Sequence, residues 1–370
     1  MSGVSEHHLA MLREQVVAAN RDRRRLAITG GGTKAFYGRP VAAAADAGPP
    51  PEVLDCRSNR GVISYEPTEL VITARCGTPL AEIETVLAER RQYLPFEPPH
   101  FGDGATLGGT VAAGLSGPRR MAVGGLRDYV LGTTLLTAQG EVLRFGGQVM
   151  KNVAGYDVSR LLAGSLGVLG VIAEVSLKVM PLPAAERTLR FAFSEAEAIR
   201  RCNQWGGQPL PISATLWADD QLTVRLSGAN AAVDTAAAKL GGDRLPADEA
   251  DTPWRSVRDH THPFFAGTGV LWRLSLPPAT PPLELAGRQL IEWGGGLRWH
   301  VPLHDHASSQ VLRELVARVG GSATLFRAGP RATVARFHPL DDTIRQIHLR
   351  LKQAFDPHRV LNPGRMYDWL

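Results

Sequence analysis

Three glycine-rich segments in the first half of this 370-residue chain are the residues best suited to chemistry. The first reads Gly30-Gly31-Gly32-Thr33-Lys34 and directly follows a short apolar run. Successive glycines leave their backbone N–H groups uncovered, so they can form a concave set of donors for a pyrophosphate, and Lys34 adds a positive charge. A flexible turn would contain the same residues. The segment is neither a P-loop nor the G-x-G-x-x-G dinucleotide motif.

The second and third segments make a shared ligand the better interpretation. Residues 105–110 read Ala-Thr-Leu-Gly-Gly-Thr and offer backbone and hydroxyl donors just before the small residues 111–113. Ser116-Gly117-Pro118 continues this stretch. The third segment, 164–170, precedes an apolar run, where main-chain groups can bind the edge of a planar ring. Because three such clusters exceed what a protein core requires, we predict one elongated cofactor.

Strands and helices alternate around these glycines and must position them. The apolar spacing predicts an opening helix over 5–19 and a second helix over 80–91. Apolar and β-branched runs predict strands over 25–29, 53–56, 62–65, 70–75, 130–138, 141–145 and 171–180. Pro181 and Pro183 then mark the end of a first domain, which we place at 1–183.

The sequence after Pro183 predicts a smaller second domain over 184–340. We expect strands over 189–193, 212–217, 221–226, 270–276, 297–302, 323–326 and 332–337, with helices over 194–205, 229–240 and 308–319. A polar connector with prolines spans 241–264. A last helix over 343–355 and a turn-rich tail form a C-terminal segment, 341–370. The alternation in the first domain fits α+β or α/β, and with an antiparallel sheet and helices in the second domain we predict the α+β class for the chain.

The composition is that of an ordinary globular protein, with 44% hydrophobic and 21% charged residues. No apolar stretch approaches the ~20 residues of a membrane span, and the polar start does not resemble a signal peptide. The net charge of +5 comes from dispersed basic residues without interleaved aromatics, which argues against a nucleic-acid partner. Three cysteines, Cys56, Cys76 and Cys202, lack metal or disulfide spacing, so we expect reduced thiols and a cytoplasmic location.

In their order along the chain, these motifs resemble those of the FAD-linked oxidases of the vanillyl-alcohol oxidase / p-cresol methylhydroxylase (PCMH) family. The similarity covers 25–183 and the tail, and the middle of the chain only by size and order. Within the family, the order resembles that of the FAD-binding subunits of bacterial glycolate oxidases. The residues that carry it are Gly30 to Thr33, the 104–117 run, Arg127-Asp128, Gly155-Tyr156-Asp157, 164–170, Asp356-Pro357 and Asn362-Pro363-Gly364-Arg365.

The resemblance implies a PCMH-type FAD-binding domain of two α/β subdomains beneath a smaller cap domain. It assigns the pyrophosphate to Gly30, Gly31, Gly32, Thr33, Lys34, Ala105, Thr106, Gly108 and Gly109. It puts Ser116 and Gly117 along the ribityl chain and flavin, and Gly164, Gly167, Gly170, Val171 and Asn362 against the flavin or the adenine side. Tyr156-Asp157 orients the flavin or caps the following helix. Thr33-Lys34 stands where members with covalent flavin have a histidine, so we predict non-covalent FAD.

The resemblance also implies oxidation of a small 2-hydroxy acid, which requires a cation for the carboxylate and a base for the hydroxyl proton. Arg298, Arg327, Arg331 and Arg336 are candidates for the cation, although each suits an ordinary surface equally well. The candidate bases are His300, His304 and His306. His304-Asp305-His306 suggests a metal pair, but no third ligand is identified, so we predict no metal.

The leading hypothesis is an FAD-binding subunit of a glycolate oxidase complex. The resemblance implies two partners, a second FAD subunit of D type and an iron–sulfur subunit of F type, with at most peripheral membrane association through them. This chain then either oxidises glycolate to glyoxylate or relays electrons from that reaction. Two alternatives are a stand-alone FAD-linked oxidoreductase of another 2-hydroxy acid or alcohol, and a non-catalytic assembly subunit.

Overall fold

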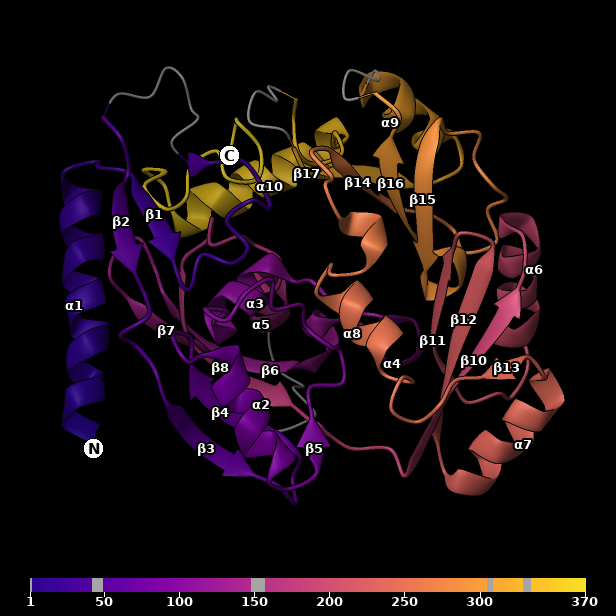
Figure 1. The fold of residues 1–370 in the computed structure, drawn as a ribbon. Coiled ribbons are helices and arrows are strands. Elements are labelled where there is room, and N and C mark those ends of the chain that lie inside the picture. Colours follow the sequence, from indigo (N-terminus) through magenta and orange to yellow (C-terminus); the bar gives the residue numbers. More distant parts are fainter. Residues whose placement is uncertain (1, 42–48, 148–156, 305–308, 329–333) are drawn as a thin grey trace.

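Two large sheets stand on opposite sides of the molecule, which confirms the α+β class (Figure 1). The computed structural model describes residues 2–41, 49–147, 157–304, 309–328 and 334–370. The first part of the chain contains α1 (Ser2–Arg21), β1 (Leu26–Thr29), β2 (Glu52–Asp55), β3 (Val62–Glu66), β4 (Val71–Arg75), α2 (Leu80–Ala88), β5 (Gln92–Tyr93), α3 (Leu107–Ala113), α4 (Arg120–Val123), β6 (Val130–Leu136), β7 (Val142–Gly146), α5 (Val158–Leu162), β8 (Val171–Lys178) and β9 (Met180–Pro181).

A short parallel pair, β1 and β2, carries the first glycine cluster at its end. Helix α1 covers this pair and buries Leu12 and Val16 beside Leu26 and Leu54 (Figure 1). The neighbouring five-stranded sheet has the order β3-β4-β8-β6-β7 and is antiparallel throughout. Because β1 stops at Thr29, the chain leaves the pair directly into the three glycines.

Helix α3, which was not predicted, forms from the second glycine cluster. Thr106 caps its first turn, because the Thr106 hydroxyl accepts a hydrogen bond from the N–H of Gly109. Gly114, with φ of 65°, ends it in the left-handed conformation that glycine favours. The helix was not predicted because it contains two consecutive glycines, and each glycine in a helix interior is less favourable than alanine by about 1 kcal/mol. Gly108 is nevertheless required here, because a Cβ on it would lie 2.7 Å from the Cβ of Cys76.

The second sheet has eight antiparallel strands in the order β13-β10-β12-β11-β15-β16-β14-β17. Helices α6 and α7 cover the outer face of its β10–β12 part (Figure 1). This part of the chain contains β10 (Ala185–Ala192), α6 (Glu195–Gly206), β11 (Ile212–Ala218), β12 (Gln221–Gly228), α7 (Asn230–Leu240), β13 (Asp243–Arg244), α8 (Thr252–Arg258), β14 (Leu271–Ser275), β15 (Gly287–Glu292), β16 (Leu297–Pro302), α9 (Ser309–Arg318) and β17 (Ser322–Arg327). The C-terminal segment contains α10 (Asp342–Phe355).

Three sequence-based expectations in this part were wrong. Strand β15 was missed because it begins with the polar residues Gly287-Arg288-Gln289. Helix α8 lies inside the expected connector 241–264. The expected strand over 332–337 is not a strand in its described part, 334–337, where the N–H of Leu325 still donates to the carbonyl of Arg336 at 2.7 Å.

The boundary between the two parts lies between strands β9 and β10. Strand β9 pairs with β5 of the first part, whereas β10 begins the eight-stranded sheet. We therefore propose to keep the division at residue 183, with 184–340 as the cap. Among the described residues, no helix is both long and apolar enough to cross a bilayer.

The C-terminal segment returns to β1 and packs beside the strand that leads into the first glycine cluster. The N–H of Leu26 donates to the carbonyl of Val360 at 2.7 Å, and the N–H of Asn362 donates to the carbonyl of Leu26 at 3.0 Å. Lys352 and Asp356, both fully buried, form an ion pair of 2.8 Å at the start of this return. Residue Asn362 is thereby held beside the strand that leads into Gly30.

Candidate functional site

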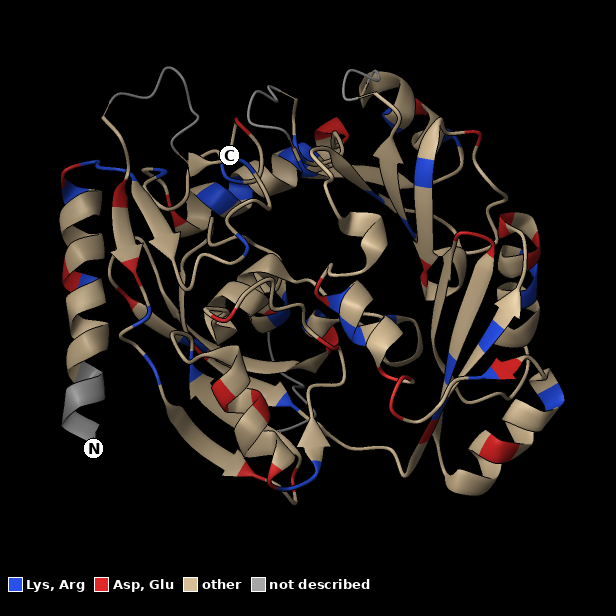
Figure 2. Cartoon of the chain, viewed as in Figure 1, with Lys and Arg blue, Asp and Glu red and all other residues tan. Residues whose placement is uncertain are grey.

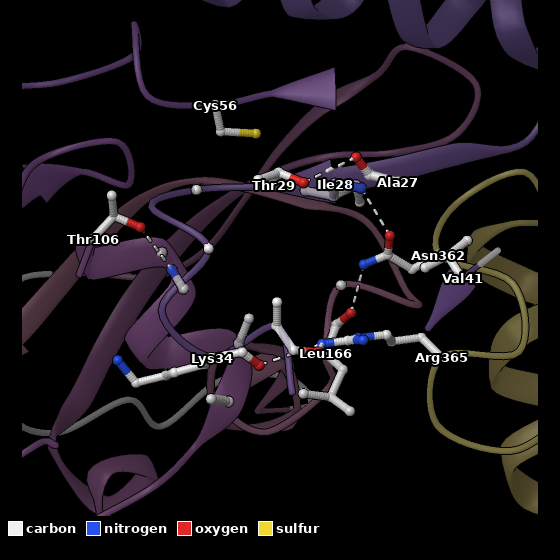
Figure 3. A pocket seen from close by; sticks show the side chains of 18 of the residues that line it. Ala27, Ile28, Thr29, Lys34, Val41, Cys56, Thr106, Leu166, Asn362 and Arg365 are labelled. Atoms are coloured by element: carbon white, nitrogen blue, oxygen red, sulfur yellow. Dashed lines mark hydrogen bonds between the residues drawn. The ribbon is translucent and has the colours of Figure 1, made fainter. Parts of the chain in front are cut away.

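A cavity of about 470 Å³ lies between β1, α3 and the C-terminal tail (Figure 3). All three glycine clusters contribute to its lining, together with apolar side chains such as Ile28 and Ile172. Charged side chains of both signs are interspersed over the whole molecule (Figure 2), so overall charge does not mark a site. What distinguishes the cavity is the backbone of the glycine clusters that line it.

Backbone donors of the first cluster have no hydrogen-bond partner among the described residues. Among the described residues, the N–H groups of Gly30, Gly31, Gly32, Thr33 and Lys34 donate no hydrogen bond. The second cluster differs, because the N–H of Gly108 donates to the carbonyl of Cys76 at 2.8 Å and that of Gly109 to Thr106 Oγ1 at 3.3 Å. Since unpaired main-chain donors in a cavity favour an anionic ligand, residues 30–34 suit an anionic group better than the second cluster does.

The three consecutive glycines are needed for two different reasons. A Cβ on Gly31 would lie 1.4 Å from the carbonyl oxygen of Gly104, and one on Gly30 would lie 2.3 Å from Thr106 Oγ1. These two glycines allow the first and second clusters to touch. Gly32 has φ of 72°, and a Cβ there would meet nothing within 4 Å. Gly32 therefore provides a left-handed turn beside open space.

Lys34 brings a buried positive charge to the cavity. Its side chain is almost fully buried, and Nζ donates to the carbonyl of His100 at 3.4 Å. Burial lowers the pKa of Lys34 to about 8, because the charged form loses hydration, and Asp259 opposes this shift. An anion bound here would restore part of the lost stabilisation.

Asn362 joins three segments at the edge of the cavity (Figure 3). Its Oδ1 accepts from the N–H of Ile28 at 2.8 Å, and its Nδ2 donates to the carbonyl of Leu166 at 2.7 Å. Arg365 likewise donates to the carbonyls of Arg39 and Ala35, at 2.7 and 2.9 Å. Both tail residues therefore hold the loops around the cavity through backbone groups.

The residues predicted to bind the cofactor fall into three groups. Those that line the 470 Å³ cavity are Gly30, Gly31, Gly32, Thr33, Lys34, Thr106, Gly108, Gly109, Gly167, Gly170 and Asn362. Ala105, Gly164 and Val171 are not among its lining residues, and Ser116 and Gly117 line a second cavity under the cap sheet. Tyr156 lies outside the described residues. Asp157 caps α5, as its carboxylate accepts from the N–H of Arg160.

Several lining residues were missed by sequence reasoning. Cys56 and Cys76 line the cavity as buried, unpaired cysteines. Burial raises the pKa of Cys56 to about 12, so its thiol stays protonated. Cys56 is therefore a small apolar lining residue and not a nucleophile. Ala112 and Ala113 of α3 also line it. The run of small residues at 111–113 was the available signal, because small side chains let a ligand approach a helix closely.

The candidate catalytic side chains do not gather at either cavity. Arg298 is fully buried and donates to the carbonyls of Pro281 and Thr280, and His300 shares its face of β16. Neither lines either of these cavities. Arg327 lies at the other side of the sheet, 5.3 Å from the ring of Phe36. Asp305, His306 and Arg331 lie outside the described residues, and the described ones contain no cluster suited to a metal.

The unpaired amides, the buried cation and the apolar walls together fit FAD, whose pyrophosphate and ring systems need these surfaces. The fold and the cavity define a PCMH-type FAD-binding oxidoreductase, and the FAD binding domain family matches residues 4–146. The chain is 48% identical over 356 residues to glycolate oxidase subunit GlcE of Escherichia coli K12, which covers 96% of both chains. It belongs to the GlcE family of glycolate oxidase subunits.

More distant relatives match about a third of the chain in sequence, or share the fold at low identity. Glycolate oxidase subunit GlcD of Bacillus subtilis is 30% identical over 137 residues, which cover 37% of this chain and 29% of GlcD. A solved structure of alkyldihydroxyacetonephosphate synthase superposes with a TM-score of 0.65 at 14% identity. It covers 95% of this chain and 74% of the synthase, which shows that the fold is shared over nearly the whole length.

Proposed function

We propose that this chain is an FAD-binding subunit of a glycolate oxidase, in which glycolate loses two electrons and two protons to give glyoxylate. The supporting observation is the likeness to GlcE along nearly the full length of both chains. Bound FAD supplies the two-electron acceptor. The chain either holds glycolate itself or relays electrons that a partner subunit takes from it.

The residues of the glycine cavity have separate tasks in this proposal. The free amides of 30–34 donate to the pyrophosphate, and Lys34 balances part of its charge. Asn362 and Arg365 keep the surrounding loops in place through their hydrogen bonds. Thr33 and Lys34, at the end of the cluster, cannot form the histidine linkage of covalent flavoproteins, so the FAD is dissociable.

We further propose that the chain works in a complex with a D-type FAD subunit and an F-type iron–sulfur subunit. The likeness to GlcD supports a common origin for two flavin subunits of one assembly. A cytoplasmic location is part of the proposal, and the three buried, unpaired cysteines favour a reducing compartment.

A second candidate function is a stand-alone oxidoreductase of another 2-hydroxy acid. It is favoured by the likeness to a D-lactate dehydrogenase of Anaerostipes hadrus, 34% identical over 137 residues, or 37% of this chain. That match covers 28% of the dehydrogenase, so the likeness to GlcE carries more weight.

Flavin spectroscopy of the purified protein tests these proposals. The chain is purified alone and after co-expression with D-type and F-type subunits, and FAD is quantified per chain. Glycolate is then added without oxygen, and we expect bleaching of the flavin in the co-purified complex. A chain that contains no FAD and takes up none contradicts the flavin assignment. A monomer that is fully active alone contradicts the multisubunit proposal.

A further inference from the structure

The segment 100–104 lies between the first glycine cluster and the cap. The carbonyl of His100 accepts a hydrogen bond from Lys34 Nζ at 3.4 Å, and the N–H of the same residue donates to Oδ1 of Asp259 at 2.9 Å. The last carbonyl oxygen of the segment is the atom that a Cβ on Gly31 would meet. His100 therefore connects a lysine of the cofactor cavity to a carboxylate of the cap.

Asp259 comes directly after helix α8, whose packing fixes its place. Trp254 and Val257 of α8 are buried in a core cluster that takes residues from both parts of the chain. In Figure 1, α8 accordingly runs between the two large sheets. The second carboxylate oxygen of Asp259 accepts two hydrogen bonds from Arg258, at 2.7 and 3.0 Å. Both oxygens are thereby engaged, and the carboxylate cannot turn away from His100 without losing these bonds.

Charged groups from several elements surround Lys34. The ring of His100 pairs with Glu84 of α2 at 3.1 Å, and Arg365 of the tail donates to the carbonyl of Lys34 at 3.4 Å. Asp259 is the carboxylate that favours the charged form of Lys34, against the burial that disfavours it. Because the side chain of Asp259 is only 23% exposed, solvent screens this attraction less than it would on the surface.

We propose that Asp259 is a positioning residue for FAD, which holds segment 100–104 in place and keeps the ammonium group of Lys34 charged for the pyrophosphate. Asp259 lines neither the glycine cavity nor the smaller cap cavity, the one that Arg273 and Glu292 line. It therefore acts on the cofactor through Lys34, and the cap influences how tightly the first part of the chain binds FAD. The inference rests on FAD as the ligand of the glycine cavity and holds whatever the substrate is.

Fluorescence titration of the FAD-free protein with FAD at pH 6 and at pH 8 tests this. Asp259→Asn keeps an oxygen that can accept from the N–H of His100 but removes the charge. Without that charge Lys34 loses its proton at a lower pH, so FAD affinity should fall more between the two pH values. We expect the ratio of the affinity at pH 6 to that at pH 8 to be roughly threefold larger in Asp259→Asn than in wild type.

The matched control is Asp251→Asn, at the other end of α8. Asp251 is exposed and pairs with Arg255 at 2.9 Å, so water screens its charge from the cavity. Its affinity ratio should equal that of wild type. A second comparison adds Asp259→Asn to Lys34→Gln, which has no ammonium group left to respond. In that background the ratio should not change.

The outcomes separate this inference from the flavin assignment. An unchanged ratio in Asp259→Asn overturns the inference. A loss of affinity by the same factor at both pH values also overturns it, because such a loss shows a purely structural role. In both cases wild type still binds FAD, and the flavin assignment survives. If Asp259→Asn does not fold, Asp259→Ser, which is also neutral and carries an acceptor, must show the larger ratio. A wild type that takes up no FAD contradicts the flavin assignment itself, and this inference with it.

Discussion

The two cavities of this protein present different chemical groups to a ligand. The glycine cavity offers main-chain amides and has few charged side chains, whereas the cap cavity offers Arg273, His260 and Glu292. A backbone site depends on close approach of segments and tolerates no added Cβ where those segments touch, as at Gly30 and Gly31. A side-chain site depends on desolvated charges and therefore on pH. Mutations in the first cavity should accordingly act by changing how closely its segments approach. Mutations in the second cavity should act by changing the charge of its side chains.

The largest expected effect comes from the tail that closes the glycine cavity. Lys352 Nζ donates to Asp356 and to the carbonyls of Val168 and Leu361, each at 2.8 Å. Lys352→Met leaves the Asp356 carboxylate buried without its cation, which should cost about 3 to 5 kcal/mol of unfolding free energy. Denaturant unfolding measures it. Lys239→Met, at an exposed site on α7, is the control and should change little.

Next in size is the effect of a single methyl group in the glycine cavity. Gly31→Ala brings a Cβ to 1.4 Å from the carbonyl of Gly104, so the two clusters must separate. We expect a loss of about 3 kcal/mol or more and purification without FAD. Gly32→Ala meets no atom within 4 Å and should cost only the left-handed backbone, about 1 kcal/mol. The ratio of flavin to protein absorbance distinguishes the two. Equal flavin content in both variants would contradict the claim that contact between the two glycine clusters is needed for FAD binding.

The cap cavity should respond to pH instead. Because the pKa of Glu292 is raised to about 7, its contribution to stability is present at low pH and is lost as the pH rises through 7. As the pH rises from 5 to 8, ionisation of this group should lower the unfolding free energy of wild type by about 2 to 3 kcal/mol. Glu292→Gln keeps the acceptor for Trp299 but does not titrate. The unfolding free energy of Glu292→Gln should therefore fall less than that of wild type over that range. If the two proteins show the same dependence of unfolding free energy on pH, Glu292 is not the titrating group.

The elements with local signals were predictable from the sequence. The strands over 212–217 and 221–226 were expected, and Asp219-Asp220 between β11 and β12 have positive φ, 49° and 56°, as a tight two-residue hairpin requires. The glycine clusters were found because glycine is costly unless a ligand, a turn or a close contact requires it. Helix α3 was missed for the same reason, since a packing contact with Cys76 overrides its poor propensity.

The cap cavity was not predictable because its residues are distant in sequence and ordinary in type. His260, Arg273 and Glu292 come from separate elements, and no local pattern distinguishes them from surface residues. Arg298 and His300 were nominated instead. On β16 both faces are buried, so the alternation that usually reveals the inner face is absent. The packing of Trp299 on Phe326, and of Phe326 on Phe36 at 5.4 Å, shows which face meets the first part of the chain.

The smallest expected effect concerns Lys34, a charged side chain within the backbone cavity. Because its pKa is about 8 in the free protein, Lys34 is positively charged below pH 8 and loses its charge above it. A bound pyrophosphate favours the charged form, so FAD affinity should fall as the pH rises from 7 to 9, by roughly tenfold. Lys34→Gln should bind FAD more weakly at pH 7 and show a flatter pH profile. Fluorescence titration of the FAD-free protein measures both. If Lys34→Gln keeps the full pH dependence, the charge that matters lies elsewhere, and Arg365→Gln becomes the variant to compare.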